Sequence, residues 1–102
     1  MQQNIIALKD SIEYQSGSVV SKEIIKREGG TITIFAFDEG QGLSEHTAPF
    51  NAFALILDGE AQINIGKTPH TLIEDQFIEM PANEPHSLKA SKKFKMLLAM
   101  IK

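Results

Sequence analysis

The 102-residue sequence contains no cysteine and no tryptophan, and it has only one tyrosine. The absence of cysteine excludes disulfides, thiolate zinc sites and iron–sulfur clusters. There is also no run of about 18 apolar residues, the length that a membrane-spanning helix needs. The first residues lack the basic start and apolar core of a secretion signal, so we expect a cytoplasmic protein.

Basic residues are scarce as well. The chain has 10 Lys and Arg against 13 Asp and Glu, for a formal net charge of −3. A nucleic-acid-binding surface needs a basic stripe, and the only basic cluster lies between Lys89 and Lys95. We interpret this cluster as a solvated turn and strand face. The charge pattern therefore predicts no nucleic-acid partner and no membrane partner.

What the sequence does contain is alternation of apolar and polar residues with a period of two, broken by Gly, Pro, Asn and Asp. This pattern is typical of short antiparallel strands, and about nine of them indicate a sandwich or barrel. The length and the absence of a linker favour one domain over residues 1–102. The predicted strands are 5–8, 19–26, 31–37, 52–58, 60–65, 70–72, 76–80, 86–90 and 94–101.

The pair Asp58-Gly59 lies between two of these apolar runs. A type I′ turn requires positive φ at both central residues, and Asp-Gly is one of the pairs that supply it. The sequence therefore predicts a tight hairpin at this point.

Two of the strands, 52–58 and 94–101, are apolar on both faces. A strand of a small antiparallel barrel needs only one buried face, so something must cover the other. Phe53, Leu55 and Leu57 would expose too much apolar surface on a monomer. The candidates for the cover are the N-terminal segment, residues 1–25, and a second subunit. We predict a homodimer with residues 1–25 at its interface, where the N-terminal strand could be exchanged between subunits.

Three histidines are the best candidates for chemistry. His46 follows the glycine-rich loop 40–45, His86 follows the proline-bounded turn 81–85, and His70 stands beside Pro69. We interpret His70 as an exposed turn residue. His46 and His86 are the candidate site residues.

The surroundings of these two histidines resemble the two motifs of the cupin family. The first motif, G-x5-H-x-H-x(3,4)-E-x6-G, fits residues 40–59 in frame, from Gly40 through His46 to Gly59. The second, G-x5-P-x-G-x2-H-x3-N, fits residues 75–90 through Pro81, Asn83 and His86. Asn83 is an acceptable replacement for glycine at a turn that needs positive φ. The resemblance implies an all-β fold, an antiparallel jelly-roll β-barrel.

The resemblance also implies a metal site, but only in part. Metal-binding cupins hold a divalent ion with two His and one Glu of the first motif and one His of the second. His46 and His86 match the first and last of these ligands, whereas Ala48 and Ala52 replace the other two. His46 and His86 are therefore the tentative metal ligands. The ion implied is a divalent one, with Mn, Fe, Ni and Zn not distinguished.

Alternation along the strands defines the predicted interior of the barrel. Positions two apart share a face, so an apolar wall with two imidazoles at one end is expected. Such a wall with few polar groups is typical of a small-molecule pocket. The last strand contributes either Met96, Leu98 and Met100 or its opposite face. The predicted pocket residues are His46, Ala48, Phe50, Ala52, Ala54, His86 and Leu88.

These observations leave more than one function open. The first hypothesis is a binding protein that holds a small organic ligand, with or without a divalent metal, between His46 and His86. The alternative is a metal-dependent enzyme of the dioxygenase, isomerase or decarboxylase type that uses the same two residues. A third hypothesis, in which one His acts as a metal-free general base, follows from the ordinary imidazole pKa of about 6.5.

Overall fold

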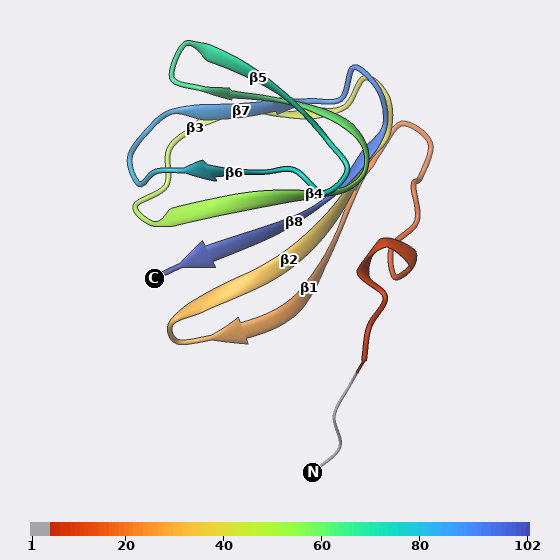
Figure 1. Cartoon of the computed structure of the whole chain (residues 1–102), viewed down its shortest axis with the longest axis horizontal. Coiled ribbons are helices and arrows are strands. Elements are labelled where there is room, and N and C mark those ends of the chain that lie inside the picture. Colours follow the sequence, from red (N-terminus) through yellow and green to blue (C-terminus); the bar gives the residue numbers. More distant parts are fainter. Residues whose placement is uncertain (1–4) are drawn as a thin grey trace.

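The structure is a computed structural model, and it describes residues 5–102 (Figure 1). Its regular elements over these residues are eight strands and one 3₁₀ helix. No helix in this range is long and apolar enough to cross a membrane. The elements are η1 Leu8–Asp10, β1 Val19–Arg27, β2 Gly30–Phe37, β3 Gly42–His46, β4 Asn51–Ile65, β5 Thr68–Ile73, β6 Phe77–Met80, β7 His86–Lys89 and β8 Phe94–Ile101.

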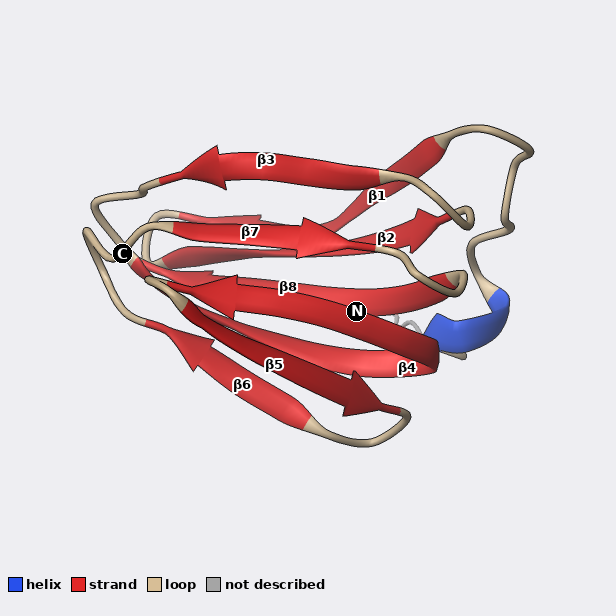
Figure 2. Cartoon of the chain, turned by 90° about the horizontal axis from the view of Figure 1, so that it is seen from above, coloured by secondary structure: helices blue, strands red, loops and turns tan. Residues whose placement is uncertain are grey.

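The strands form one curled antiparallel sheet, which we describe as two sheets that share β4 (Figure 2). The first sheet has the order β1-β2-β8-β4-β6, and the second has the order β5-β4-β7-β3. The first part of β4 pairs with β8 and β6, and the last part pairs with β5 and β7. The predicted jelly-roll β-barrel is confirmed.

The predicted hairpin at Asp58-Gly59 is wrong, because β4 runs through both residues as one strand of 15 residues. Gly59 has φ +78°, but Asp58 does not adopt a positive φ, so no type I′ turn forms. The register against β8 shifts between Ile56 and Asp58. The Asp-Gly pair therefore marks a bulge at which β4 bends from the first sheet into the second.

The predicted strand at residues 5–8 is also wrong. Residues 5–7 have no regular structure, and the chain then turns through η1, where the Ser11 hydroxyl donates to the Leu8 carbonyl at 2.9 Å. The following residues place Ile12 and Tyr14 against the outer surface of the first sheet, in one apolar cluster with Leu57 and Leu97. The N-terminal segment thus covers part of the apolar surface that the sequence leaves open.

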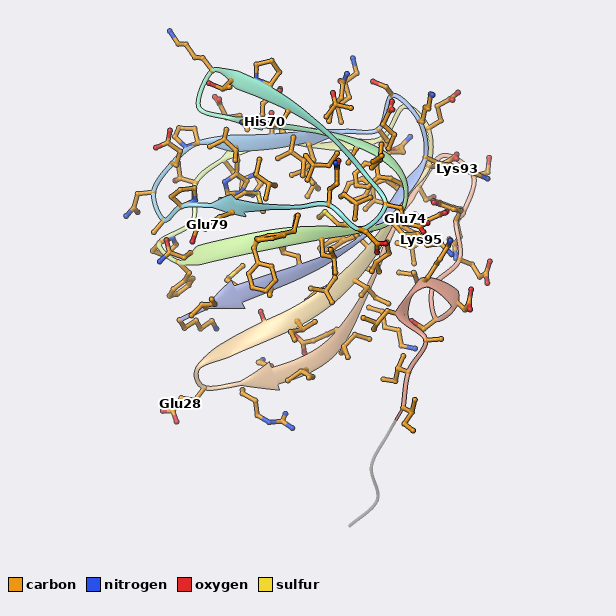
Figure 3. All side chains as sticks on the ribbon, viewed as in Figure 1. Glu28, His70, Glu74, Glu79, Lys93 and Lys95 are labelled. Atoms are coloured by element: carbon orange, nitrogen blue, oxygen red, sulfur yellow. The ribbon has the colours of Figure 1, made fainter. Side chains whose placement is uncertain are left out.

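A set of polar contacts fastens this segment to the barrel, and we call it the clasp: Lys9, Tyr14, Asp58 and Lys95. The Tyr14 hydroxyl donates to Asp58 Oδ2 at 2.7 Å, and the buried Lys95 Nζ donates to the Lys9 carbonyl at 2.7 Å. Lys9 Nζ lies 3.5 Å from Asp58 Oδ1. Figure 3 shows Lys93 and Lys95 with Glu74 at this end of the barrel.

The clasp shifts the pKa of both members of its central pair. The hydrogen bond from the Tyr14 hydroxyl lowers the pKa of Asp58 below 3.8, burial opposes this shift, and the smaller effects of the Lys9 and Lys95 charges add to the lowering. Burial, and then the bond to Asp58, raise the pKa of Tyr14 above its ordinary value of 10.0. Tyr14 therefore stays a hydrogen-bond donor and Asp58 an ionised acceptor.

Where β4 bends, large apolar side chains fill the interior of the barrel. The rings of Phe37 and Phe94 stack with centroids 4.5 Å apart, beside the fully buried Ile56 and Met96. Phe94 pairs with Gly59 across β4 and β8, at the end near the clasp. At the other end of the same two strands Ala52 pairs with Met100, and there small side chains leave space.

Candidate functional site

Two imidazoles meet at the open end of the barrel. His46 is the last residue of β3 and His86 the first of β7, and the two are cross-strand partners. Their ring centroids are 4.3 Å apart and their planes cross at 68°. Figure 2 shows this end of β3 and β7 on the side of the molecule away from η1. The structure thus brings together the two histidines that the motifs single out.

Both rings are held in the same way. His46 Nδ1 lies 2.8 Å from the Ser44 carbonyl oxygen, and His86 Nδ1 lies 3.2 Å from the Glu84 carbonyl oxygen. A carbonyl oxygen can only accept a hydrogen bond, so each Nδ1 must carry the proton. In a neutral ring this leaves the lone pair on Nε2. The backbone two residues upstream therefore fixes the tautomer of each imidazole.

The two rings differ in exposure. His46 is exposed, whereas His86 is only 7% exposed. Burial lowers the pKa of His86 below the ordinary 6.5, and the neighbouring His46 lowers it further, against the opposing effect of the Glu84 carbonyl. His86 is therefore a neutral imidazole at neutral pH, with Nε2 as a hydrogen-bond acceptor.

Below the two rings lies a narrow cavity of about 50 Å³. Apart from the imidazoles its wall is apolar, and three of its side chains are methionines. A volume of this size admits a few water molecules or the head group of a small ligand, and not a whole drug-sized molecule. The lining residues are Leu43, His46, Ala48, Ala52, Met80, His86, Leu88, Met96, Leu98 and Met100.

Two of the seven predicted pocket residues lie elsewhere. Phe50 precedes β4 and is half-buried, with Lys102 Nζ 5.5 Å from its ring centroid. Ala54 is fully buried in the core one step further along β4, where it pairs with Ile78 and Leu98. The other five predicted residues line the cavity.

The cavity also contains residues that sequence reasoning missed. Leu43 lines it because the register of β3 against β7 shifts between Leu43 and His46, which places an odd and an even position on one face. Met80 comes from the short strand β6, for which the sequence assigned no inward face. The register of β8 settles the open alternative in favour of Met96, Leu98 and Met100.

The third histidine takes no part in this site. His70 lies within β5, opposite Ile63, and it is half-buried. It is thus a strand residue and not the exposed turn residue that the sequence predicts.

The motif positions that are usually glycine share one backbone property. Gly40 and Gly59 have φ of +87° and +78°, and Asp75 and Asn83, which replace glycines of the second motif, have φ of +72° and +66°. The left-handed conformation expected for Asn83 is confirmed. Asn and Asp tolerate this conformation better than other non-glycine residues, so the turns that position His86 keep their shape.

The donors needed for the implied four-ligand metal site are incomplete. Over residues 5–102, no three His, Cys, Asp or Glu side chains are grouped so that they could hold a metal ion. Glu84 is exposed, and its carboxylate lies near the turn at Gly66. The two Nε2 atoms and the thioethers of the cavity wall are the donors at this end of the barrel. They do not fit the family's His₃Glu set.

Comparison with solved structures places this geometry in a family. A conserved protein of unknown function from Streptococcus pyogenes is 32% identical with a TM-score of 0.92, and the match covers 100% of this chain and 90% of that one. A cupin 2 conserved barrel domain protein from Leptotrichia buccalis is 35% identical with a TM-score of 0.92. That match covers 95% of this chain and 47% of the Leptotrichia chain, so this chain spans about half of its length.

A cupin superfamily protein from Desulfitobacterium hafniense is 27% identical with a TM-score of 0.91, over 99% of this chain and 93% of that chain. No protein-family model and no curated protein matches the sequence. The fold, the in-frame motifs and the paired histidines, together with these structures, show that the chain belongs to the cupin superfamily.

Proposed function

We propose that this cupin is a binding protein that anchors the polar head group of a small organic ligand between His46 and His86. The observation that carries the proposal is the hydrogen-bonding pattern that the two rings share, with both Nδ1 protons bound to backbone carbonyls and the Nε2 atoms left for a ligand at the mouth of an apolar cavity. Few convergent polar groups on an apolar wall are typical of ligand sites.

The protonation of the rings limits the chemistry of the ligand. Since the pKa of His86 is lowered, its Nε2 accepts a hydrogen bond at neutral pH. The matching group on a ligand is a donor such as a hydroxyl. The cavity holds about 50 Å³, so the apolar body of a larger ligand would extend past the exposed His46 to solvent. Small phenols and diols satisfy both conditions.

A thermal-shift measurement with catechol in the presence of EDTA tests this proposal. We expect the melting temperature of the wild type to rise with catechol concentration, and the rise to disappear in the His46→Ala/His86→Ala variant. His70→Ala is the matched control, because His70 lies outside the cavity, and it should respond like the wild type. Equal shifts in the double variant and the wild type would show that the histidines are not the anchor.

A second candidate is a metal-dependent function, and one observation favours it. Imidazoles that bind metals usually donate the other ring N–H to a carboxylate or backbone carbonyl, as both rings do here. Two imidazoles would hold a divalent ion only with help from water or from a ligand carboxylate. Metal analysis of protein purified without chelator separates the candidates: near-stoichiometric metal that the double variant lacks supports a metal centre.

A further inference from the structure

The outer surface of the first sheet carries an apolar face on the side away from the cavity. The strand register places Ile25, Ile32, Ala99 and Phe53 in one row across β1, β2, β8 and β4. The neighbouring row ends with Leu55 on β4 and Phe77 on β6. Antiparallel sheets that face water normally place polar residues on that side, so these rows require another explanation.

From residue 5 onwards, the N-terminal segment covers only one end of this surface. It reaches Leu57 and Leu97, but further along β4 an open groove of about 490 Å³ is lined by Phe53, Leu55, Phe77 and Glu79. Phe77 is 67% exposed, and its ring meets that of Phe53 edge to face at 6.3 Å. We define the outer apolar face as Ile25, Ile32, Phe53, Leu55, Phe77 and Ile101.

The two edges of this face carry opposite charges. On β1, Lys22 and Arg27 pair with Ile34 and Gly30 of β2, so they lie on the outer side. On β6, at the opposite edge of the sheet, Glu79 pairs with Phe53 and lies on the same side. Figure 3 shows Glu79 on β6, on the far side of β4 and β8 from β1 and β2. The face thus runs from a basic edge, across an apolar centre, to an acidic edge.

We propose that the outer apolar face is the interface with a second copy of this chain, related by a two-fold axis that runs parallel to the strands. Such an axis places the β1 edge of one copy over the β6 edge of the other. Along the strands, the row of cross-strand neighbours that contains Glu79 lies between the row of Lys22 and the row of Arg27. The partner's Glu79 therefore lies between Lys22 and Arg27. A two-fold axis across the strands would instead place like charges together.

The size of the face agrees with a dimer of modest area. A fully exposed aromatic side chain presents a surface of about 200 Å², and an isoleucine side chain presents somewhat less. From their exposed fractions, the six side chains of the face together leave on the order of 400 Å² accessible to solvent. Ile101 is 57% and Ile25 39% exposed. A standard interface covers roughly 800 Å² per partner, a little over half of it apolar. The face therefore supplies about the apolar share that such a dimer needs.

Sedimentation velocity tests the proposal directly. We expect the wild type to sediment at twice the 11.3 kDa chain mass at micromolar concentration, and Phe77→Asp to sediment as a monomer with an unchanged circular dichroism spectrum. Ile73→Asp is the matched control, because Ile73 is 52% exposed but lies on β5 of the second sheet. This variant should remain a dimer.

Crosslinking tests the orientation, and the absence of native cysteine gives it no background. Arg27→Cys and Glu79→Cys proteins, mixed and treated with a short bismaleimide, should give a crosslinked dimer, whereas neither protein alone should. This experiment also decides the matter if Phe77→Asp does not fold. A monomeric wild type, a dimeric and folded Phe77→Asp, or crosslinking of Arg27→Cys alone would overturn the proposal.

Discussion

At the scale of single residues, the site depends on what two alanines leave out. Ala48 and Ala52 stand at the positions where metal-binding relatives are expected to place a histidine and a glutamate, and both line the cavity here. Their small side chains leave the two imidazoles as the polar groups of an otherwise apolar wall. The proposed anchor for a ligand is thus a consequence of missing side chains as much as of those present.

Restoring a carboxylate should move the site toward metal binding. In Ala52→Glu, the new side chain would enter the cavity from β4, since Ala52 lines it and is 5% exposed. We expect the affinity for Zn²⁺, measured by isothermal titration, to rise at least about tenfold, which corresponds to ~1.4 kcal/mol. Ala52→Gln, which has the same shape without the charge, should show no such gain. An unchanged affinity in Ala52→Glu would mean that position 52 does not reach the two rings.

Alternation predicted five of the residues that line the cavity, and the differences between the predicted and the observed lining have local causes. The five predicted residues that line the cavity follow a strict period of two from His46 or His86. Leu43 escaped because a register shift in β3 breaks that period. Phe50 was misplaced because it lies in the loop before β4, where alternation does not apply. Sequence alone carries no signal for where a strand loses its register.

At the scale of elements, β4 decides the architecture. Its 15 residues belong to both sheets, and the bend at Gly59 is what makes this sharing feasible. Sequence reasoning found the special backbone at Asp58-Gly59 but assigned it to a hairpin. A bulge and a tight turn use the same residues, and only the pairing of β4 with β8 distinguishes them. That pairing joins segments far apart in the chain, so local sequence could not reveal it.

The bend gives a prediction about stability. In Gly59→Ala, the residue would have to keep φ near +78°, and its Cβ would overlap the Lys93 carbonyl oxygen. We expect the free energy of unfolding, measured with urea, to fall by more than about 2 kcal/mol. Gly40→Ala provides the control, because Gly40 has φ +87° but open space around it. This variant should lose only the free energy of holding a non-glycine residue at positive φ, roughly 1 kcal/mol. Equal losses in both variants would show that the contact with β8 is unimportant.

The first part of the chain was the least predictable element. An apolar run at residues 5–8 reads as a strand, yet the docking of Ile12 and Tyr14 on the first sheet draws the chain into a 3₁₀ turn instead. The need for a cover over β4 and β8 was nevertheless visible from their two apolar faces. The N-terminal segment meets part of that need, and the proposed second copy would meet the rest.

At the scale of the whole molecule, the clasp links the N-terminal segment to the point where β4 bends. The stability that its central pair, Tyr14 and Asp58, contributes to the fold depends on pH. The pKa of Asp58 is lowered on folding, so its contribution to stability is present above 3.8 and is lost as the pH falls through the folded value. The pKa of Tyr14 is raised, so its contribution is present below 10.0 and is lost at more alkaline pH.

Tyr14→Phe should therefore lower stability between about pH 4 and pH 10, and lower it less beyond either limit. The urea midpoint of the variant and the wild type, measured from pH 2.5 to pH 11, checks this expectation. Glu13→Gln, an exposed change next to the clasp, should track the wild type at every pH. A constant difference between Tyr14→Phe and the wild type over the whole range would contradict the assigned ionisation of the pair.

The position of β8 has a consequence for how this chain folds. β8 lies between β2 and β4 in the first sheet, yet it follows both in the chain. Until β8 has been synthesised, β2 and β4 each keep one unpaired edge, the edge that later pairs with β8, and such edges are templates for association with other chains. The centre of the barrel must then close in a late step over a long sequence separation, and such steps are slow. The aggregation risk of the growing chain is therefore highest after β4 has been synthesised and before β8 pairs with it.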